Sequence, residues 1–258
     1  MEKGRLMISL EDQVAIITGG SRGIGAATAV LFAKAGANIL LTYVQNEKAA
    51  KEVQEEIELL GRKCIIIRAN VAKAKNAKKV VEKAMQKFGQ IDILVNNAGI
   101  WTHGEMGKMT EETWNETMEI NLNGTFHMIN ATVPYMKKRH FGKIINISST
   151  AGQRGEAFHS HYAASKGAII SLTKSLSTEL GGFNINVNSV APGWVDTDLS
   201  ADVLRNQKLA EEARKGIPIG RVPTAEDIAG PILFLACDLS RHITGEILNV
   251  NGGSVLVG

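Results

Sequence analysis

The sequence predicts a doubly wound α/β fold, in which helices cover both faces of a parallel sheet. Short apolar runs alternate with longer amphipathic stretches from one end of the 258-residue chain to the other. The apolar runs are nearly continuous, which is typical of parallel strands buried on both faces. Right-handed crossovers through helices connect such strands. Together these observations indicate one parallel sheet between two layers of helices.

Strands and helices are expected in alternation. The strands are expected at residues 14–17, 39–43, 64–67, 91–95, 143–147, 185–190 and 246–250. The helices are expected at residues 23–36, 47–60, 73–88, 110–136, 161–180 and 225–236. No linker, repeat or change of composition divides the chain. We therefore expect a tail of residues 1–10 and a single domain of residues 11–258.

The composition narrows the class of protein. A hydrophobic content of 44% and a charged content of 21% are ordinary for a globular domain. Cys64 and Cys237 lie far apart in apolar runs and lack the spacing of a zinc site, so buried thiols in a reducing, cytoplasmic setting are expected. No segment has the apolar length of a signal peptide or a membrane span. The net charge is only +3 and the basic clusters contain no aromatic residues, which argues against a nucleic-acid partner.

A glycine-rich turn follows the first expected strand and opens the first helix. It reads TGGSRGIG from Thr18 to Gly25. Glycine allows a tight turn and a close approach to a pyrophosphate, which the amino-terminal end of the helix stabilises. The spacing GxxxGxG departs from the commoner GxGxxG, but its place after the first strand predicts a dinucleotide site of the Rossmann fold. The candidate cofactor-binding residues here are Gly19, Ser21, Arg22, Gly23, Ile24 and Gly25.

The end of the second strand favours NADP(H) over NAD(H). NAD sites place Asp or Glu about 20 residues past the glycines to bind the ribose 2′-hydroxyl. Residues 42–45 offer no carboxylate, and Glu47 lies a residue or two too far along. Arg22 can meet a 2′-phosphate through a charge-assisted contact, although a solvated loop cation is the simpler alternative. NADP(H) is therefore the expected cofactor, with NAD(H) as the alternative.

A second group of residues carries candidate acid–base chemistry. Tyr162 and Lys166 are four residues apart and share one face of the expected helix. A nearby ammonium lowers the pKa of a phenol toward the working range of a general base. Ser149 follows the fifth strand at the carboxyl edge of the sheet, where ligands bind in this architecture. Ser148 is either a turn residue or exchanges roles with Ser149, and the Tyr/Lys pair alone is also compatible with a surface helix.

The complete set of motifs resembles the short-chain dehydrogenase/reductase family. Its glycine turn, the sequence NNAG at residues 96–99, Asn121, Ser149, the Tyr162/Lys166 pair and Pro192-Gly193 follow in the family's order and spacing. The match extends over residues 12–254. Each motif is modest alone, whereas the set is highly specific.

The resemblance implies roles for the matching residues. Tyr162, Lys166, Ser149 and Asn121 would be catalytic, with Asn121 holding a water in a proton relay. Tyr162 and Lys166 would also contact the cofactor, together with residues expected beside the adenosine and under the nicotinamide. These further residues are Asn70, Val71, Asn97, Ala98, Gly99, Pro192, Gly193, Val195 and Thr197.

The implied reaction is hydride transfer between nicotinamide and a carbonyl/alcohol pair. Ser149 and Tyr162 would hold the carbonyl oxygen, and Tyr162 would supply the proton. A cofactor-sensing regulator on the same fold is the alternative from another class. Such a protein would be expected to have lost the Tyr/Lys pair, whereas all four catalytic positions are filled here.

The resemblance is nearest to the 3-oxoacyl-acyl-carrier-protein reductases, although sugar and polyol dehydrogenases share nearly all the motifs. An acyl-carrier protein is therefore a candidate partner, and Lys137, Lys138 and Arg139 are expected near the entrance as cations that attract it. Phe183 stands where a docking arginine would be expected. Trp101, His103, His159 and His161 are candidates for the lining of the pocket, but ordinary loop roles are expected for each.

The resemblance also implies a homotetramer that pairs the helices after the fourth and fifth strands. These helices carry more apolar residues than one sheet-facing stripe requires. The residues concerned are Met128, Ile129, Ala131, Val133, Met136, Ala168, Ile169, Ile170 and Leu172.

Overall fold

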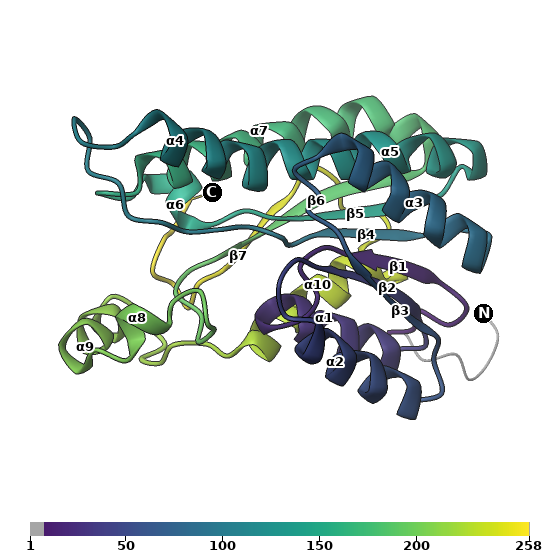
Figure 1. Cartoon of the computed structure of the whole chain (residues 1–258), viewed down its shortest axis with the longest axis horizontal. Coiled ribbons are helices and arrows are strands. Elements are labelled where there is room, and N and C mark those ends of the chain that lie inside the picture. Colours follow the sequence, from purple (N-terminus) through teal and green to yellow (C-terminus); the bar gives the residue numbers. More distant parts are fainter. Residues whose placement is uncertain (1–7, 258) are drawn as a thin grey trace.

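The computed structural model describes residues 8–257 and contains one seven-stranded sheet in the order β3-β2-β1-β4-β5-β6-β7 (Figure 1). Every neighbouring pair of strands is parallel. The strand order reverses at β1, where ligands bind in sheets of this kind. The expected doubly wound fold is confirmed. The strands are β1 (Val14–Ile17), β2 (Asn38–Tyr43), β3 (Cys64–Arg68), β4 (Ile93–Asn96), β5 (Gly142–Ile147), β6 (Ile185–Pro192) and β7 (Ile247–Val250).

Helices form a layer on each face of the sheet (Figure 1). One layer consists of α1 (Gly23–Lys34), α2 (Glu47–Leu59) and α10 (Ala225–Ala236). The other consists of α3 (Ala74–Phe88), α5 (Gly124–Arg139) and α7 (Ser160–Leu180). Shorter elements join them: α4 (Glu111–Thr117), η1 (Met118–Asn123), α6 (Thr150–Arg154), η2 (Gly181–Phe183), α8 (Ala201–Leu204), α9 (Gln207–Lys215) and η3 (Asp238–Ser240). No helix within residues 8–257 is long and apolar enough to cross a membrane.

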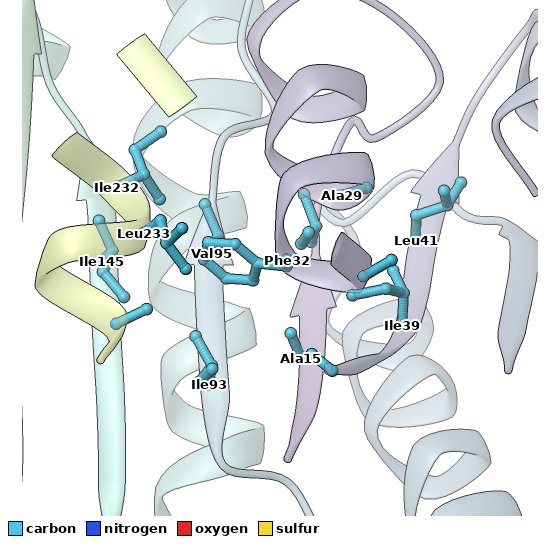
Figure 2. Close-up of a cluster of buried hydrophobic side chains, with 14 of the residues drawn as sticks. Ala15, Ala29, Phe32, Ile39, Leu41, Ile93, Val95, Ile145, Ile232 and Leu233 are labelled. Atoms are coloured by element: carbon cyan, nitrogen blue, oxygen red, sulfur yellow. The ribbon is translucent and has the colours of Figure 1, made fainter. Parts of the chain in front are cut away.

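Each strand divides its side chains between the two helical layers. Figure 2 shows the cluster under α1 and α10, where Phe32 packs among strand residues such as Val95 and Ile145. Ile16 and Leu40 belong instead to the cluster under α3 and α5, because successive strand residues point to opposite faces. A fully buried side chain of this size stabilises the fold by about 1.5–3 kcal/mol. The two clusters make the sheet a rigid platform for its loops.

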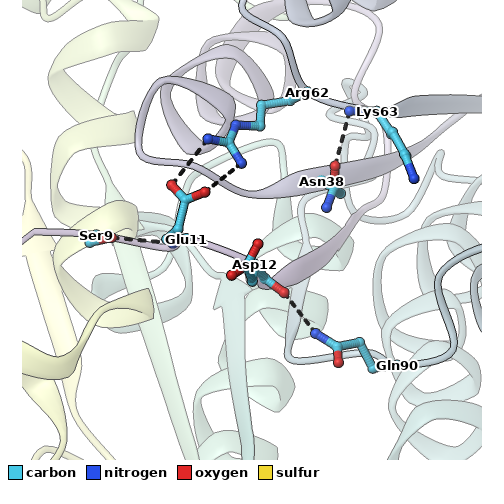
Figure 3. Close-up of polar contacts among 7 residues, drawn as sticks. All are labelled: Ser9, Glu11, Asp12, Asn38, Arg62, Lys63 and Gln90. Carbon is cyan, nitrogen blue, oxygen red and sulfur yellow. Dashed lines mark hydrogen bonds and ion pairs between the residues drawn. The ribbon is translucent and has the colours of Figure 1, made fainter.

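The amino-terminal edge of the sheet is held by polar contacts. Asp92 accepts a hydrogen bond from the Val14 amide and forms an ion pair with Arg139 at 2.6 Å. Nearby, Arg62 makes two hydrogen bonds to Glu11 (Figure 3). The expected tail of residues 1–10 lies mostly outside the described residues. At its end Leu10 is fully buried.

The segment expected as one regular helix at residues 110–136 is not regular. The chain is helical from α4 through α5, but residues Met118–Asn123 form a π-helical segment, η1. Such wide turns occur within α-helices and are frequent at functional sites. Hydrophobic periodicity did not predict this insertion, and α6, α8 and α9 were also missed.

The expected surplus of apolar residues on α5 and α7 is also partly wrong. Met128 and Met136 on α5 are fully buried in the chain's own core. Ile169 on α7 is also buried, with 1% of its surface exposed. These side chains therefore leave no apolar surface for a neighbouring subunit. Phe126 on α5, by contrast, is 49% exposed.

Candidate active site

A cavity of about 390 Å³ lies at the carboxyl ends of the strands. Segments that follow β1, β4, β5 and β6 converge on it, together with the first turns of α7. This is the crevice in which parallel α/β sheets bind ligands. The sequence-predicted residues among its lining are Ile24, Asn97, Ser149, Tyr162, Lys166, Pro192, Gly193, Val195 and Thr197.

The glycine turn depends on the absence of side chains. Gly19 and Gly23 have φ angles of +64° and +53°, in the region that favours glycine. A Cβ atom on Gly25 would lie 2.3 Å from the carbonyl oxygen of Gly19. The Gly20 amide donates to the Thr42 carbonyl at 2.9 Å, which fixes the turn against the end of β2. The backbone of this turn therefore occupies space that a side chain would block.

Asn97 braces the same turn from the segment after β4. Its side-chain amide donates to the carbonyls of Thr18 and Gly19 at 3.0 and 3.1 Å. In return, the Thr18 hydroxyl accepts from the amides of Asn97 and Ala98. These four bonds join the ends of β1 and β4 on either side of the strand reversal.

The start of α1 fits the pyrophosphate of a nicotinamide dinucleotide. No side chain caps this helix at Arg22, and its first turn contains no acidic residue. The first amides of a helix lack partners within the helix and lie at the positive end of its dipole. Combined with the side-chain-free turn, they form a ready anion site. The residues present therefore fit the cofactor that the glycine turn predicted.

Arg22 has a partner in the loop after β6. Its guanidinium forms an ion pair with Asp198 at 3.2 Å, and both side chains are more than 60% exposed. Thr197 lies against Gly23, where a Cβ atom would meet its methyl group at 3.2 Å. The glycine turn and the loop after β6 therefore touch above the cavity.

The two neighbouring serines have different surroundings. The Ser148 hydroxyl is buried and hydrogen-bonds with the Val190 carbonyl and the Ser189 hydroxyl on β6. Ser149 caps α6 by accepting from the Ala151 amide at 3.1 Å, and its side chain lines the cavity together with Tyr162. The hydroxyl of Ser148 is therefore engaged with the sheet, whereas that of Ser149 lies at the start of α6 beside the cavity.

Burial dominates the acidity of Tyr162. It raises the pKa of the phenol to about 12, against a smaller lowering by the nearby Ser149 side chain. The expectation that Lys166 lowers this pKa is wrong for this structure. Its ammonium lies 5.7 Å from the centre of the Tyr162 ring and donates instead to the Ile147 carbonyl at 2.7 Å. A pattern of four residues placed the two groups on one face without fixing where the lysine points.

Lys166 is itself buried, with 5% of its surface exposed. Burial lowers the pKa of its ammonium to about 8, because a charge is less stable away from water. Its contact with the Ile147 carbonyl is the hydrogen bond that holds it at the end of β5. At neutral pH, therefore, the Lys166 ammonium releases its proton more readily than the neighbouring Tyr162 phenol does.

Asn121 lies in η1 and is fully buried. Its amide nitrogen donates to the Ile100 carbonyl and to the Ser165 hydroxyl, and its oxygen accepts from the Ile100 amide. One side chain therefore joins η1, the segment after β4 and the helix that carries Tyr162. Asn121 does not line the cavity.

Comparisons with known proteins agree with this geometry. Residues 19–254 match a family model described as enoyl-(acyl carrier protein) reductase. The 3-oxoacyl-(acyl-carrier-protein) reductase FabG of Thermotoga maritima is 41% identical over 247 residues, which cover 96% of this chain and 99% of the relative. The 3-oxoacyl-(acyl-carrier-protein) reductase of a Synechocystis strain is 39% identical and covers 97% of this chain and all of the relative. The chain belongs to the short-chain dehydrogenase/reductase family.

A solved structure extends the similarity to three dimensions. A chain from Sinorhizobium meliloti 1021, described as a short-chain alcohol dehydrogenase, matches with a TM-score of 0.92 at 31% identity. The match covers 96% of this chain and 98% of the solved one. As a short-chain dehydrogenase/reductase, the protein is an NAD(P)-dependent oxidoreductase that acts on CH–OH groups. The alternative of a regulator without chemistry is not supported.

Some residues expected at the family's site do not line the cavity. Asn70 and Val71 follow β3, on the far side of β2, where the Asn70 side chain accepts from the Ala72 amide and Val71 packs on Gly124. Gly99 passes close to Asn121 and Lys166. Those that do not line the cavity are Gly19, Ser21, Arg22, Gly23, Gly25, Asn70, Val71, Ala98, Gly99 and Asn121.

Aromatic residues that were expected to be ordinary form part of this short-chain dehydrogenase/reductase site. Trp101 lines the cavity and stacks on His159, with ring centres 4.3 Å apart. Trp194, which sequence reasoning missed, meets Trp101 edge-on at 5.7 Å and also lines the cavity. The signal for Trp194 was its position between Gly193 and Val195, both of which were predicted to contact the cofactor. His161 is buried beside Thr102 instead.

The expected cations near the entrance are at the wrong edge of the chain. Lys137 and Arg139 end α5, immediately before β5 begins, and Arg139 pairs with Asp92 at the amino-terminal edge of the sheet. Lys137 lies over the ring of Phe183, which precedes β6. Because the cavity lies at the carboxyl edge, none of these residues flanks it within one chain. Arg154, which lines the cavity and is exposed, had not been singled out.

Proposed function

We propose that the protein uses NADPH to reduce the 3-oxo group of an acyl thioester to an alcohol. The observation that carries this proposal is the buried Ser149–Tyr162 pair in the cavity, with a phenol pKa of about 12. A phenol with that pKa keeps its proton at neutral pH, as a proton donor in a reduction must. The curated relatives named 3-oxoacyl-(acyl-carrier-protein) reductase support the substrate class.

In this mechanism the glycine turn and the start of α1 hold the dinucleotide, while Pro192, Gly193, Val195 and Thr197 hold its nicotinamide end. The bound cofactor supplies the hydride. The Ser149 hydroxyl donates a hydrogen bond to the carbonyl oxygen and stabilises the negative charge that develops there. Tyr162 donates its proton to the same oxygen. The Ser149 hydroxyl is held by the Ala151 amide before substrate arrives, which lowers the cost of its orientation.

Two further residues support Tyr162 in different ways. Lys166, whose pKa is lowered to about 8 by burial, gives up a proton more readily than an ordinary lysine and can help to return a proton to Tyr162 after it has donated its own. Asn121 is a positioning residue in this proposal, because its amide groups are engaged with Ile100 and Ser165. It thereby fixes the helical turn that presents Tyr162.

The cofactor preference is tested by steady-state kinetics. We expect a higher kcat/KM with NADPH than with NADH, and Arg22→Ala should narrow this difference by weakening the contact with the 2′-phosphate. The support is the absence of a carboxylate at residues 42–45. Glu47 is engaged elsewhere, since it pairs with Lys51 at 2.8 Å. Equal or better use of NADH by the unmodified protein would contradict the preference.

The substrate is tested with a panel of carbonyl compounds and NADPH. We expect kcat/KM to be highest for acetoacetyl-carrier protein, followed by the free acetoacetyl thioester, at low salt. Raising the salt should reduce the advantage of the carrier if exposed cations such as Arg154 attract it. Arg154→Met should lower the rate with the carrier more than the rate with the free thioester. Faster turnover of a crotonyl thioester would instead indicate enoyl reduction.

A sugar or polyol dehydrogenase is the second candidate. Trp101 and Trp194 give the cavity flat apolar surfaces, and Glu156 and Arg154 add polar groups to its lining. Such a mixture suits a polyhydroxylated ring as well as an acyl chain. The same panel separates the two functions by including glucose and simple ketones, and a clear preference for glucose oxidation with NADP⁺ would favour this candidate.

We also propose that the protein assembles as a homotetramer through α5 and α7. Phe126 supports a contact on α5, because an aromatic side chain of which 49% is exposed gains by burial against a second copy. Gel filtration with light scattering at micromolar concentration tests the assembly. A monomer would contradict it.

A further inference from the structure

The end of β2 lies between two arginines that come from its two neighbouring strands. In the order β3-β2-β1, Arg22 belongs to the turn after β1 and Arg68 is the last residue of β3. Arg68 is paired in register with Tyr43, the last residue of β2. The position that reads the ribose 2′ group in dinucleotide sites is the end of this strand. The two cations therefore flank the position that distinguishes the two nicotinamide cofactors.

Arg68 is held in place by a single hydrogen bond that leaves most of its donors free. Its Nε donates to the Val44 carbonyl at 3.0 Å. Within residues 8–257 its terminal nitrogens make no hydrogen bond or ion pair, and the residue is exposed. Anchoring through Nε limits the motion of the guanidinium plane beside residue 44. The two terminal nitrogens then offer the paired donors that match a phosphate.

The other charges near the end of β2 are already compensated. Arg22 is engaged with Asp198 at 3.2 Å. Glu47 pairs with Lys51, and the pKa of its carboxyl is lowered first by that contact and more weakly by Arg68. Arg68 therefore contributes a positive charge that no ion pair among the described residues neutralises.

We propose that Arg68 binds the 2′-phosphate of NADPH and is a main determinant of the preference for NADPH over NADH. This inference rests on the NADPH preference proposed above. Charge-assisted contacts between a guanidinium and a phosphate are among the strong hydrogen bonds of proteins. NADH carries a hydroxyl at this position, so Arg68 gains nothing comparable from it.

The test measures equilibrium binding without substrate. Dissociation constants for NADPH and NADH are obtained from energy transfer between the tryptophans and the reduced nicotinamide, for the unmodified protein and for Arg68→Met. Competition by adenosine 2′,5′-bisphosphate and by AMP isolates the adenosine end. Lys63→Met is the matched control, because Lys63 is an exposed cation that precedes the opposite end of β3 (Figure 3).

We expect Arg68→Met to weaken NADPH about tenfold while the affinity for NADH changes less than twofold. Adenosine 2′,5′-bisphosphate should lose affinity in parallel with NADPH, and AMP should not. Lys63→Met should change none of these constants, and Arg68→Lys should retain part of the preference through its charge. Equal weakening of both cofactors, or an unchanged NADPH/NADH ratio, would overturn the assignment of Arg68. No preference in the unmodified protein would overturn the NADPH proposal itself.

Discussion

The glycine turn beside the cavity and the end of the cavity at Tyr162 are built from different chemical groups. At the β1–β2 end the cradle is backbone: a turn in which Gly19 and Gly23 have positive φ angles, followed by an uncapped helix. At the β5–α7 end the functional groups are buried side chains, and Tyr162 and Lys166 both have pKa values shifted by burial. Backbone amides have a fixed charge distribution, whereas side-chain acids and bases depend on their surroundings. The first end is suited to binding, and the second to proton transfer.

The largest expected effect comes from the side-chain end. Tyr162→Phe removes the proton donor and leaves the glycine turn intact. We expect kcat/KM to fall by about 100-fold or more, since general acid catalysis contributes about 10²–10⁴. The affinity for NADPH, measured by fluorescence, should stay within twofold. Activity within tenfold of the unmodified protein would contradict the role of Tyr162.

A substitution in the glycine turn should instead impair stability and cofactor binding. In Gly25→Ala the new methyl group would meet the Gly19 carbonyl at 2.3 Å, which the turn cannot accommodate without moving. We expect the free energy of unfolding to fall by about 1–3 kcal/mol, as overpacking does, together with a loss of NADPH affinity. Denaturant unfolding and NADPH titration measure the two effects.

Gly230→Ala is the matched control for this change. Gly230 lies in α10, and a Cβ atom there would meet nothing within 4 Å. Alanine should therefore be tolerated, or stabilise the helix by up to about 1 kcal/mol. If Gly25→Ala bound NADPH normally and were as stable as this control, the turn would not depend on an absent side chain.

The smallest effect concerns the pH dependence of stability. The pKa of Lys166 is lowered from 10.5 to about 8 by burial, so between those values the unfolded chain binds more protons than the folded one. The contribution of Lys166 to the free energy of unfolding therefore rises with pH in this window. It should increase by about 1 kcal/mol from pH 8 to pH 9. We expect Lys166→Met to lack this increment when the two proteins are unfolded in urea at both pH values.

The comparison with the unmodified protein is needed because Cys64 acts in the other direction. Burial raises the pKa of its thiol from 9.0 to about 12, so the contribution of Cys64 to the free energy of unfolding falls as pH rises through that range. Both proteins contain Cys64, and its effect cancels in the difference. An identical pH dependence for Lys166→Met and the unmodified protein would show that Lys166 does not titrate in this window.

Local patterns predicted the sheet and the glycine turn well. The expected strand at residues 64–67 is Cys64–Arg68 in the structure, and the others agree to within two residues. Continuous apolar runs indicate strands that are buried on both faces. A cluster of glycines directly after a strand indicates a turn with positive φ angles. The π-helical segment was not predicted, because one extra residue in a turn leaves the hydrophobic period almost unchanged.

Features that depend on distant parts of the chain were predicted least well. Lys137 and Arg139 were expected near the entrance, yet their helix ends at the opposite edge of the sheet. The phenol of Tyr162 was expected to be more acidic, and burial by surrounding elements makes it less so. The partner of Arg22 is 176 positions away in sequence, so no local pattern could reveal it.

The single side chain of Asn121 bears on how this protein can diversify. Its hydrogen bonds join η1, the segment after β4 and α7. The position of α7, which carries Tyr162, therefore does not depend on the length or composition of the surrounding loops. The α8–α9 segment, which extends away from the layers in Figure 1, carries several groups that line the cavity but none of the groups that react. Insertions and substitutions there can reshape the pocket while the hydroxyls of Ser149 and Tyr162 stay in register. Substrate specificity can therefore change in evolution while the groups proposed to carry out the reduction are kept.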